Sequence, residues 1–124
     1  MSSAMAVTKL ESKSHSKPDE VRTPEKTRVE IVRLEGFTIG RFRMEPGWRW
    51  SECIKPIVNT ESCQTEHVGY AVSGALHIKH SDGSEAEVTA GSVYRIAPGH
   101  DAWNAGTVPA VFVEFQGAAN YAKR

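Results

Sequence analysis

The chain has few cysteines and no long apolar run, and both shortages limit what the protein can be. Its 124 residues include two cysteines, Cys53 and Cys63, without CxxC spacing, so we expect free thiols rather than a disulfide framework. No apolar segment approaches the roughly 20 residues of a membrane-spanning helix. The N-terminus lacks the apolar core of a secretory signal peptide. These absences predict a cytoplasmic protein without a membrane partner.

The chain also lacks an excess of charge of either sign. Fifteen Lys and Arg residues balance fifteen Asp and Glu residues, and the isoelectric point is close to 7.0. Nucleic-acid grooves usually carry a basic excess, so we expect no nucleic-acid partner. A chain of 13.6 kDa has the length of one domain.

Residues 1–28 contain no aromatic side chain and are rich in serine and charge, with six Lys or Arg and four Asp or Glu. Such a segment buries too little apolar surface to offset the entropy lost on ordering it. The sequence therefore predicts a disordered N-terminal tail over 1–28 and a folded domain over 29–124.

From residue 29 onward, short segments of alternating apolar and polar residues are separated by turn residues. VEIVRL and FTIGRFRME alternate in this way, and HVGYAVSG and ALHIKH are predicted to pair as a hairpin across Ser73 and Gly74. SDGS is predicted to form a tight turn, because Asp-Gly tolerates positive φ angles. No stretch sustains an amphipathic helix of three turns. Short strands with frequent Gly and Pro turns predict an all-β sandwich or small barrel.

Two stretches, HVGYAVSGALHI and DGSEAEVTAGSVYRIAPGHDAW, resemble the cupin superfamily. GYAVSGAL and AGSVYRIAPG match the apolar and glycine frame of its two motifs, G(X)5HXH(X)3,4E(X)6G and G(X)5PXG(X)2H(X)3N. The PGHDAW loop is similar to that of a poorly characterised cupin subgroup. The resemblance covers about residues 37–116 and implies a single cupin-type jelly-roll β-barrel.

The first motif's ligand positions carry other residue types in this sequence. Counted back from the motif's closing glycine, its glutamate falls at His67. Its paired histidines fall at Glu61 and Cys63 if three residues intervene, or at Thr60 and Ser62 if four intervene. His67 is equally compatible with a buried core histidine, Cys63 with a small buried apolar residue, and Glu61 with a solvated loop charge.

The second motif's histidine falls at Ala102, and His100 lies two residues earlier. A shift of two residues keeps a side chain on the same face of a strand. Imidazole, thiolate and carboxylate groups together suit divalent transition metals, so the resemblance implies a site for Zn, Fe, Ni or Mn. Its predicted ligands are His67, His100, Cys63 and Glu61.

Aromatic residues near these positions predict a ligand pocket. Trp48 and Trp50 are two residues apart and project to the same face of an extended segment. Tyr94 and Trp103 are predicted to join them, although each aromatic is also compatible with core packing. Asp101 follows His100 and is predicted to fix the tautomer of that imidazole.

The resemblance implies a protein that binds small molecules. We expect a metal-dependent enzyme of the isomerase, lyase or dioxygenase type, acting on a polar organic acid or a sugar-like substrate. The alternative is a metal-free barrel that binds a ligand or regulates another process without catalysis.

The first folded segment also predicts an oligomer. VEIVRL has no evident partner strand before it, and an unpaired strand edge favours pairing with another chain. Two-fold dimers are the commonest homo-oligomers. We therefore expect a homodimer that forms through this strand or the sheet face beside it.

Overall fold

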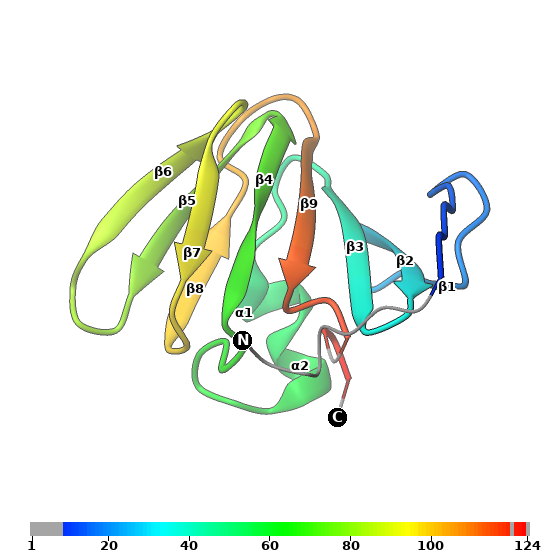
Figure 1. The fold of residues 1–124 in the computed structure, drawn as a ribbon. Coiled ribbons are helices and arrows are strands. Elements are labelled where there is room, and N and C mark those ends of the chain that lie inside the picture. Colours follow the sequence, from blue (N-terminus) through cyan, green and yellow to red (C-terminus); the bar gives the residue numbers. More distant parts are fainter. Residues whose placement is uncertain (1–8, 120, 124) are drawn as a thin grey trace.

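The computed structural model describes residues 9–119 and 121–123, which form nine strands and two short helices (Figure 1). In chain order these are β1 (Glu20–Arg22), β2 (Thr27–Leu34), β3 (Phe37–Met44), α1 (Trp50–Cys53), α2 (Lys55–Val58), β4 (His67–Ser73), β5 (Ala75–His80), β6 (Glu85–Thr89), β7 (Val93–Ile96), β8 (His100–Trp103) and β9 (Ala110–Gln116). No helix in the described part of the chain is both long and apolar enough to cross a membrane.

The strands form two antiparallel sheets. One has the order β1-β2-β3-β9-β4-β7, and the other has the order β6-β5-β8. In Figure 1, β1 to β3 lie on the right and β5, β6 and β8 on the left, with β4 and β9 between them. Apolar side chains of both sheets share one core, which includes Ile31, Phe112, Leu76 and Ile78. This architecture confirms the predicted all-β, single-domain jelly roll.

The alternation seen in the sequence sets which residues enter that core. In β2, Thr27, Val29 and Ile31 are buried, whereas Arg28 is exposed and Glu30 only partly covered. Successive side chains of a strand point to opposite faces, so every second residue of β2 faces the core. The predicted strands at VEIVRL and FTIGRFRME are therefore confirmed, as β2 and β3.

The predicted hairpin across Ser73 and Gly74 is wrong. β4 pairs with β7 and β9, whereas β5 pairs with β6 and β8, so the chain changes sheet at Gly74. Gly74 has φ +72°, and a Cβ there would lie 2.5 Å from the Pro109 carbonyl oxygen. The corner thus needs glycine for its backbone angle and for its close approach to the chain entering β9. The predicted Asp-Gly turn is confirmed, because it joins β5 to β6.

The structure places a strand within the predicted tail. β1 spans Glu20–Arg22 and pairs with β2, which itself begins at Thr27. Residues 1–8 lie outside the described part of the chain. β2 is therefore paired on both sides, by β1 and β3, and the sheet edges are β1 and β7. The contact predicted through an unpaired VEIVRL edge is wrong, because β1 already occupies that edge. The homodimer, and a contact through the sheet face beside this strand, stay predictions.

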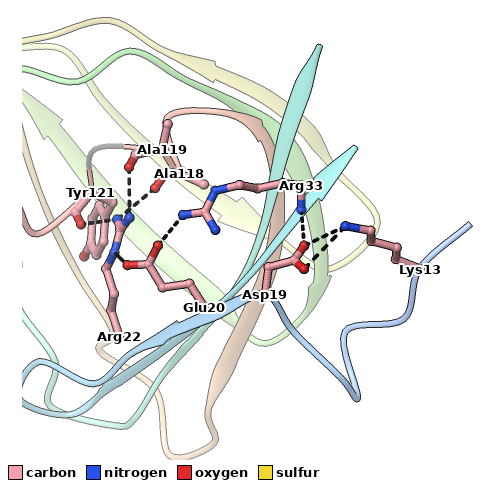
Figure 2. Close-up of polar contacts among 8 residues, drawn as sticks. All are labelled: Lys13, Asp19, Glu20, Arg22, Arg33, Ala118, Ala119 and Tyr121. Atoms are coloured by element: carbon pink, nitrogen blue, oxygen red, sulfur yellow. Dashed lines mark hydrogen bonds and ion pairs between the residues drawn. The ribbon is translucent and has the colours of Figure 1, made fainter. Parts of the chain in front are cut away.

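β1 also fastens the far end of the chain (Figure 2). The Arg22 guanidinium donates hydrogen bonds to the carbonyl oxygens of Ala118 (3.1 Å), Ala119 (2.9 Å) and Tyr121 (2.8 Å). Its Nε donates to Glu20 Oε2 at 2.7 Å, so each of the three guanidinium nitrogens has a partner. One side chain of the first strand thereby fixes the backbone at Ala118, Ala119 and Tyr121, three residues that we call the C-terminal segment.

A second set of contacts supports β1 from its outer side. Arg33 also donates to Glu20, and the Asp19 carboxylate accepts from the Arg33 backbone N–H (2.7 Å) and from Lys13 Nζ (3.1 Å) (Figure 2). The hydrogen bonds from Arg22 and Arg33 lower the pKa of Glu20 to about 2. Glu20 is thus an anionic bridge between two arginines.

Replacing Arg22 is expected to release the C-terminal segment. Arg22→Gln removes three hydrogen bonds from a charged donor to main-chain carbonyls, so we expect the free energy of unfolding to fall by about 2 kcal/mol. Arg28→Gln is the matched control, because Arg28 is half exposed and its side chain contacts Glu30. Urea denaturation measures both variants. Equal stability of the two would contradict the role given to Arg22.

The Glu20 bridge predicts a dependence of stability on pH. The folded pKa of about 2 lies below the usual value of 4.5, so the ionised carboxylate stabilises the fold above pH 4.5. That contribution is lost as the pH falls from 4.5 towards 2. The stability difference between wild type and Glu20→Gln should therefore shrink across this window. Denaturation series at pH 7, 4.5 and 3 test it, and a difference that stays constant would refute it.

Candidate functional site

Three of the four predicted ligands come together inside the barrel. Cys63 precedes β4, His67 begins β4 and His100 begins β8. The backbone joins two of them directly, because the Cys63 N–H donates to the His100 carbonyl at 2.8 Å. One thiol and two imidazoles thus place their ligand atoms within 4.8 Å of one another, and all three residues are buried.

Glu61 does not join this cluster. Its side chain is 97% exposed and lies 3.6 Å from Lys55 Nζ, in the loop between α2 and β4. An ion pair between so exposed a carboxylate and a single lysine contributes little to stability, and the carboxylate stays hydrated. Of the two interpretations of Glu61, the structure therefore matches the solvated loop charge.

A carboxylate that the sequence reasoning missed holds His67 in place. Glu114, on β9, is only 6% exposed, and its Oε1 lies 2.6 Å from His67 Nδ1. The Tyr94 hydroxyl donates to Glu114 Oε2 at 2.8 Å, and burial together with the Glu114 charge raises the pKa of Tyr94. Glu114 stands two residues after Phe112, on the inward face of β9. A charged residue on a buried face was the signal that could have found it.

The electrostatics of Cys63 and His67 are those of a thiolate beside an imidazolium. The His67 Nε2 lies 3.5 Å from the Cys63 sulfur. Burial raises the pKa of Cys63, but hydrogen bonds from His100 and His67 outweigh it and bring the pKa to about 6. For His67, burial lowers the pKa, but the Glu114 charge and the bond to Cys63 raise it, to about 10.

Both imidazoles have one nitrogen occupied and one turned to the cluster. The Nδ1 of His67 bonds Glu114, and the Nδ1 of His100 lies 2.8 Å from the Ala97 carbonyl oxygen. A carbonyl can only accept, so His100 carries a proton on Nδ1, and its Nε2 is the nitrogen left for the cluster. Metal-bound histidines commonly show this arrangement, with the second nitrogen donating to a carboxylate or carbonyl. The donor set therefore fits a transition metal.

The predicted pocket residues divide into two groups. Trp48, Trp50 and Tyr94 line a cavity next to the imidazoles of His67 and His100. The remaining lining is mostly apolar and comprises Phe42, Met44, Leu76, Ile78, Ile96, Ala102, Phe112, Glu114 and Tyr121. The cavity is thus closed mainly by aromatic and aliphatic side chains.

Trp103 and Asp101 lie outside this lining. The Trp103 ring stacks on His77 with centroids 4.7 Å apart, and the Arg49 guanidinium covers it at 4.2 Å. Asp101 accepts from the Ser51 N–H (3.1 Å) and from Arg49 (3.5 Å). The Ala97 carbonyl, and not Asp101, therefore makes the contact that fixes the tautomer of His100.

Two polar groups of the cavity lining have no partner in the described part of the chain. They are the indole Nε1–H of Trp48 and the hydroxyl of Tyr121. The Tyr121 ring lies against Phe42 (centroids 4.7 Å apart) and near His67 (6.3 Å). A buried donor without an acceptor costs about 1–3 kcal/mol, so two in one cavity are unusual.

A glycine gives the His67–Glu114 pair its space. Gly117 has φ +115°, and a Cβ there would lie 2.7 Å from His67 Nδ1 and 3.0 Å from Glu114 Oε1. Both the backbone angle and the space exclude other residues. The turn after β9 is thus shaped around the candidate site.

Gly117→Ala is therefore expected to disturb the site as well as the backbone. Gly91→Ala is the matched control, because Gly91 has φ +90° but nothing within 4 Å of its would-be Cβ. The control should lose about 1–2 kcal/mol of stability from the backbone alone. Gly117→Ala should lose more and should shift the His67 Nδ1 proton in NMR spectra. An unshifted proton in a folded Gly117→Ala variant would contradict the close approach.

No family model matches the chain, and no curated protein matches it. Solved structures do. The polyketide cyclase RemF of Streptomyces resistomycificus has a TM-score of 0.62 and 14% identity, covering 89% of this chain and 80% of its own. An RmlC-like cupin of Shewanella frigidimarina has a TM-score of 0.54 and 16% identity, covering 81% and 85%.

A Cupin_2 domain of an XRE family transcriptional regulator of Enterobacter cloacae has a TM-score of 0.52 and 22% identity, covering 73% of this chain and 94% of its own. Identities this low show likeness of fold and leave activity open. Two of the three structures are cupins by description. The predicted resemblance is thus confirmed at the level of structure: this chain has the cupin fold.

Proposed function

We propose that the protein is a metal-dependent enzyme acting on a small molecule, with Cys63, His67 and His100 as its metal ligands. The observation that carries this proposal is the buried cluster of three ligand atoms within 4.8 Å, reached by strands of both sheets. Thiolate and imidazole ligands suit Zn²⁺ and also Fe²⁺ or Ni²⁺. Three protein ligands are the number typical of catalytic sites, which keep a position for substrate or water.

The protonation of the cluster is compatible with metal binding. Metal ligands must be deprotonated, and the lowered pKa of Cys63 already favours the thiolate near neutral pH. His67 would give up the proton on Nε2 and keep the one on Nδ1, where Glu114 holds it. Metal binding should therefore release about one proton per site at neutral pH.

The bound metal would supply Lewis-acid polarisation of a substrate oxygen or a site for O₂. The chain's own residues would orient the substrate and exclude water. Glu114 fixes the orientation of His67, and Tyr94 fixes Glu114 by donating to its other oxygen. The aromatic walls around Trp50 and Phe112 keep bulk water from the site.

The lining narrows the substrate class. A sugar needs many hydrogen-bonding partners, whereas most residues around this cavity are apolar. Of the two predicted classes, the cavity therefore favours the organic acid over the sugar-like substrate. The polyketide cyclase with the same fold gives an example of a cupin-like barrel that is described as an enzyme.

A metal-free regulatory or ligand-binding barrel is the second candidate. One observation favours it: Cys63, His67 and Glu114 already satisfy one another through hydrogen bonds. The transcriptional regulator domain with the same fold is consistent with such a role. Metal content separates the two candidates.

Metal analysis of protein purified without a histidine tag tests the proposed function. We expect close to one transition-metal ion per chain in wild type and loss of the metal in Cys63→Ser and His67→Ala, with unchanged β-sheet circular dichroism. Glu61→Gln is the matched control and should keep the metal, because Glu61 lies outside the cluster.

Two outcomes would overturn the metal site. The first is a folded wild type that takes up no Zn²⁺, Fe²⁺, Ni²⁺ or Mn²⁺ on reconstitution, which would favour the regulatory barrel. The second is metal retention by both ligand variants. Loss of folding in His67→Ala would make Cys63→Ser the deciding variant, since a serine hydroxyl conserves the size of the side chain.

A further inference from the structure

Two hydrogen-bond donors in the lining of the cavity beside Cys63, His67 and His100 have no acceptor in the described part of the chain. Trp48 and Tyr121 both belong to its lining, and neither the indole Nε1–H nor the hydroxyl meets an acceptor among the described residues. An indole nitrogen can only donate, so Trp48 needs an acceptor from elsewhere. A tyrosine hydroxyl can also accept a hydrogen bond, but its O–H group still needs an acceptor.

The acceptors nearby are already in use. Both oxygens of Glu114 are bonded, one to His67 and the other to Tyr94. The Ala97 carbonyl accepts from His100. The rest of the lining, apart from the imidazoles, is apolar or aromatic. None of these groups lies within hydrogen-bond distance of either donor.

Both donors are held in place by forces that do not involve the donor atoms. Arg22 fixes the C-terminal segment by its backbone carbonyls (Figure 2). Phe42 packs edge-on against the Tyr121 ring. Trp48 is fixed by its own backbone, which donates to Glu45 (3.0 Å) and accepts from Asn104 (2.8 Å). The fold thus keeps two unpaired donors on residues that line the cavity, at a cost in stability, and such groups gather at binding sites.

We propose that Trp48 Nε1–H and Tyr121 O–H recognise the carbonyl-type oxygen of a small molecule whose body is apolar. An oxygen with two lone pairs satisfies both kinds of donor, and the aromatic walls fit a hydrocarbon body. A neutral ketone and a carboxylate share this chemistry. The inference rests on the proposed small-molecule function of the cavity, and it does not depend on whether the cluster binds a metal.

Three probes of similar size test it: cyclopentanone, cyclopentanecarboxylate and cyclopentane. Each is titrated into the ¹⁵N-labelled full chain, once metal-free and once with added Zn²⁺, while the indole N–H signals of the three tryptophans are followed. Comparison with Trp48→Phe assigns the Trp48 signal. We expect an oxygen-bearing probe to bind about 10-fold more tightly than cyclopentane and to move the Trp48 signal downfield.

Tyr121→Phe removes the hydroxyl while keeping the ring that packs on Phe42. It should reduce the preference for the oxygen probe about 5-fold or more and leave cyclopentane binding unchanged. Tyr70→Phe is the matched control, because Tyr70 is 42% exposed on β4 and lies outside the cavity. It should leave all affinities as in wild type. If Trp48→Phe fails to fold, the probe affinities of Tyr121→Phe and wild type still test the inference.

Three results would overturn the inference: no probe binds, cyclopentane binds as tightly as the oxygen probes, or the Trp48 signal and Tyr121→Phe show no response. In each case buried water, rather than a ligand, would be the partner of the two donors. A chain that prefers the oxygen probe but takes up no metal would sink the metal proposal and leave this one intact. A chain that takes up metal but shows no preference for the oxygen probes would overturn this inference and leave the metal proposal intact. Comparing the affinities of cyclopentanone and cyclopentanecarboxylate shows whether the site prefers a ketone or a carboxylate oxygen.

Discussion

The buried hydrogen bond between His67 and Glu114 is the contact on which the candidate site depends. It joins the first residue of β4 to β9, two strands that already pair in the same sheet. A buried carboxylate is costly unless it is bonded, and Tyr94 and His67 bond one oxygen each. The pair then fixes the imidazole against Cys63, and Gly117 gives it room. The backbone around the site is therefore adapted to one ion pair.

The two ends of the described chain cooperate to close the cavity. Arg22, near the start, holds the C-terminal segment that carries Tyr121. The segment that the sequence predicts as a disordered tail thus contributes the strand that orders the opposite end of the fold. A change at Arg22 is therefore also a change to one wall of the cavity.

The sequence was sufficient for the parts of the structure that local pattern controls. Alternation predicted β2 and β3, and the Asp-Gly turn and the motif frame predicted the barrel that the structure has. The motif also brought Cys63, His67 and His100 to attention, and the structure gathers them. It could not exclude Glu61, because loop exposure is set by tertiary contacts.

What the sequence missed lies in long-range contacts. Glu114 and Tyr121 reach the cluster only because β9 and the C-terminal segment fold back over it. The hairpin error has the same origin, since the alternation of β4 and β5 does not say which sheet each joins. Likewise, the charged sequence of residues 9–26 does not indicate that Arg22 will donate hydrogen bonds to three main-chain carbonyls near the other end of the chain.

The separation along the chain of the contacts made by Arg22 has a consequence for folding kinetics. These hydrogen bonds join residues 96 to 99 positions apart, and closing so long a loop is entropically unfavourable until the strands between are formed. The C-terminal segment should therefore dock late, after the two sheets have met. Contacts that form last are commonly the first to open in the native state. Transient release of this one segment, while both sheets stay intact, would widen the way into the cavity for small molecules.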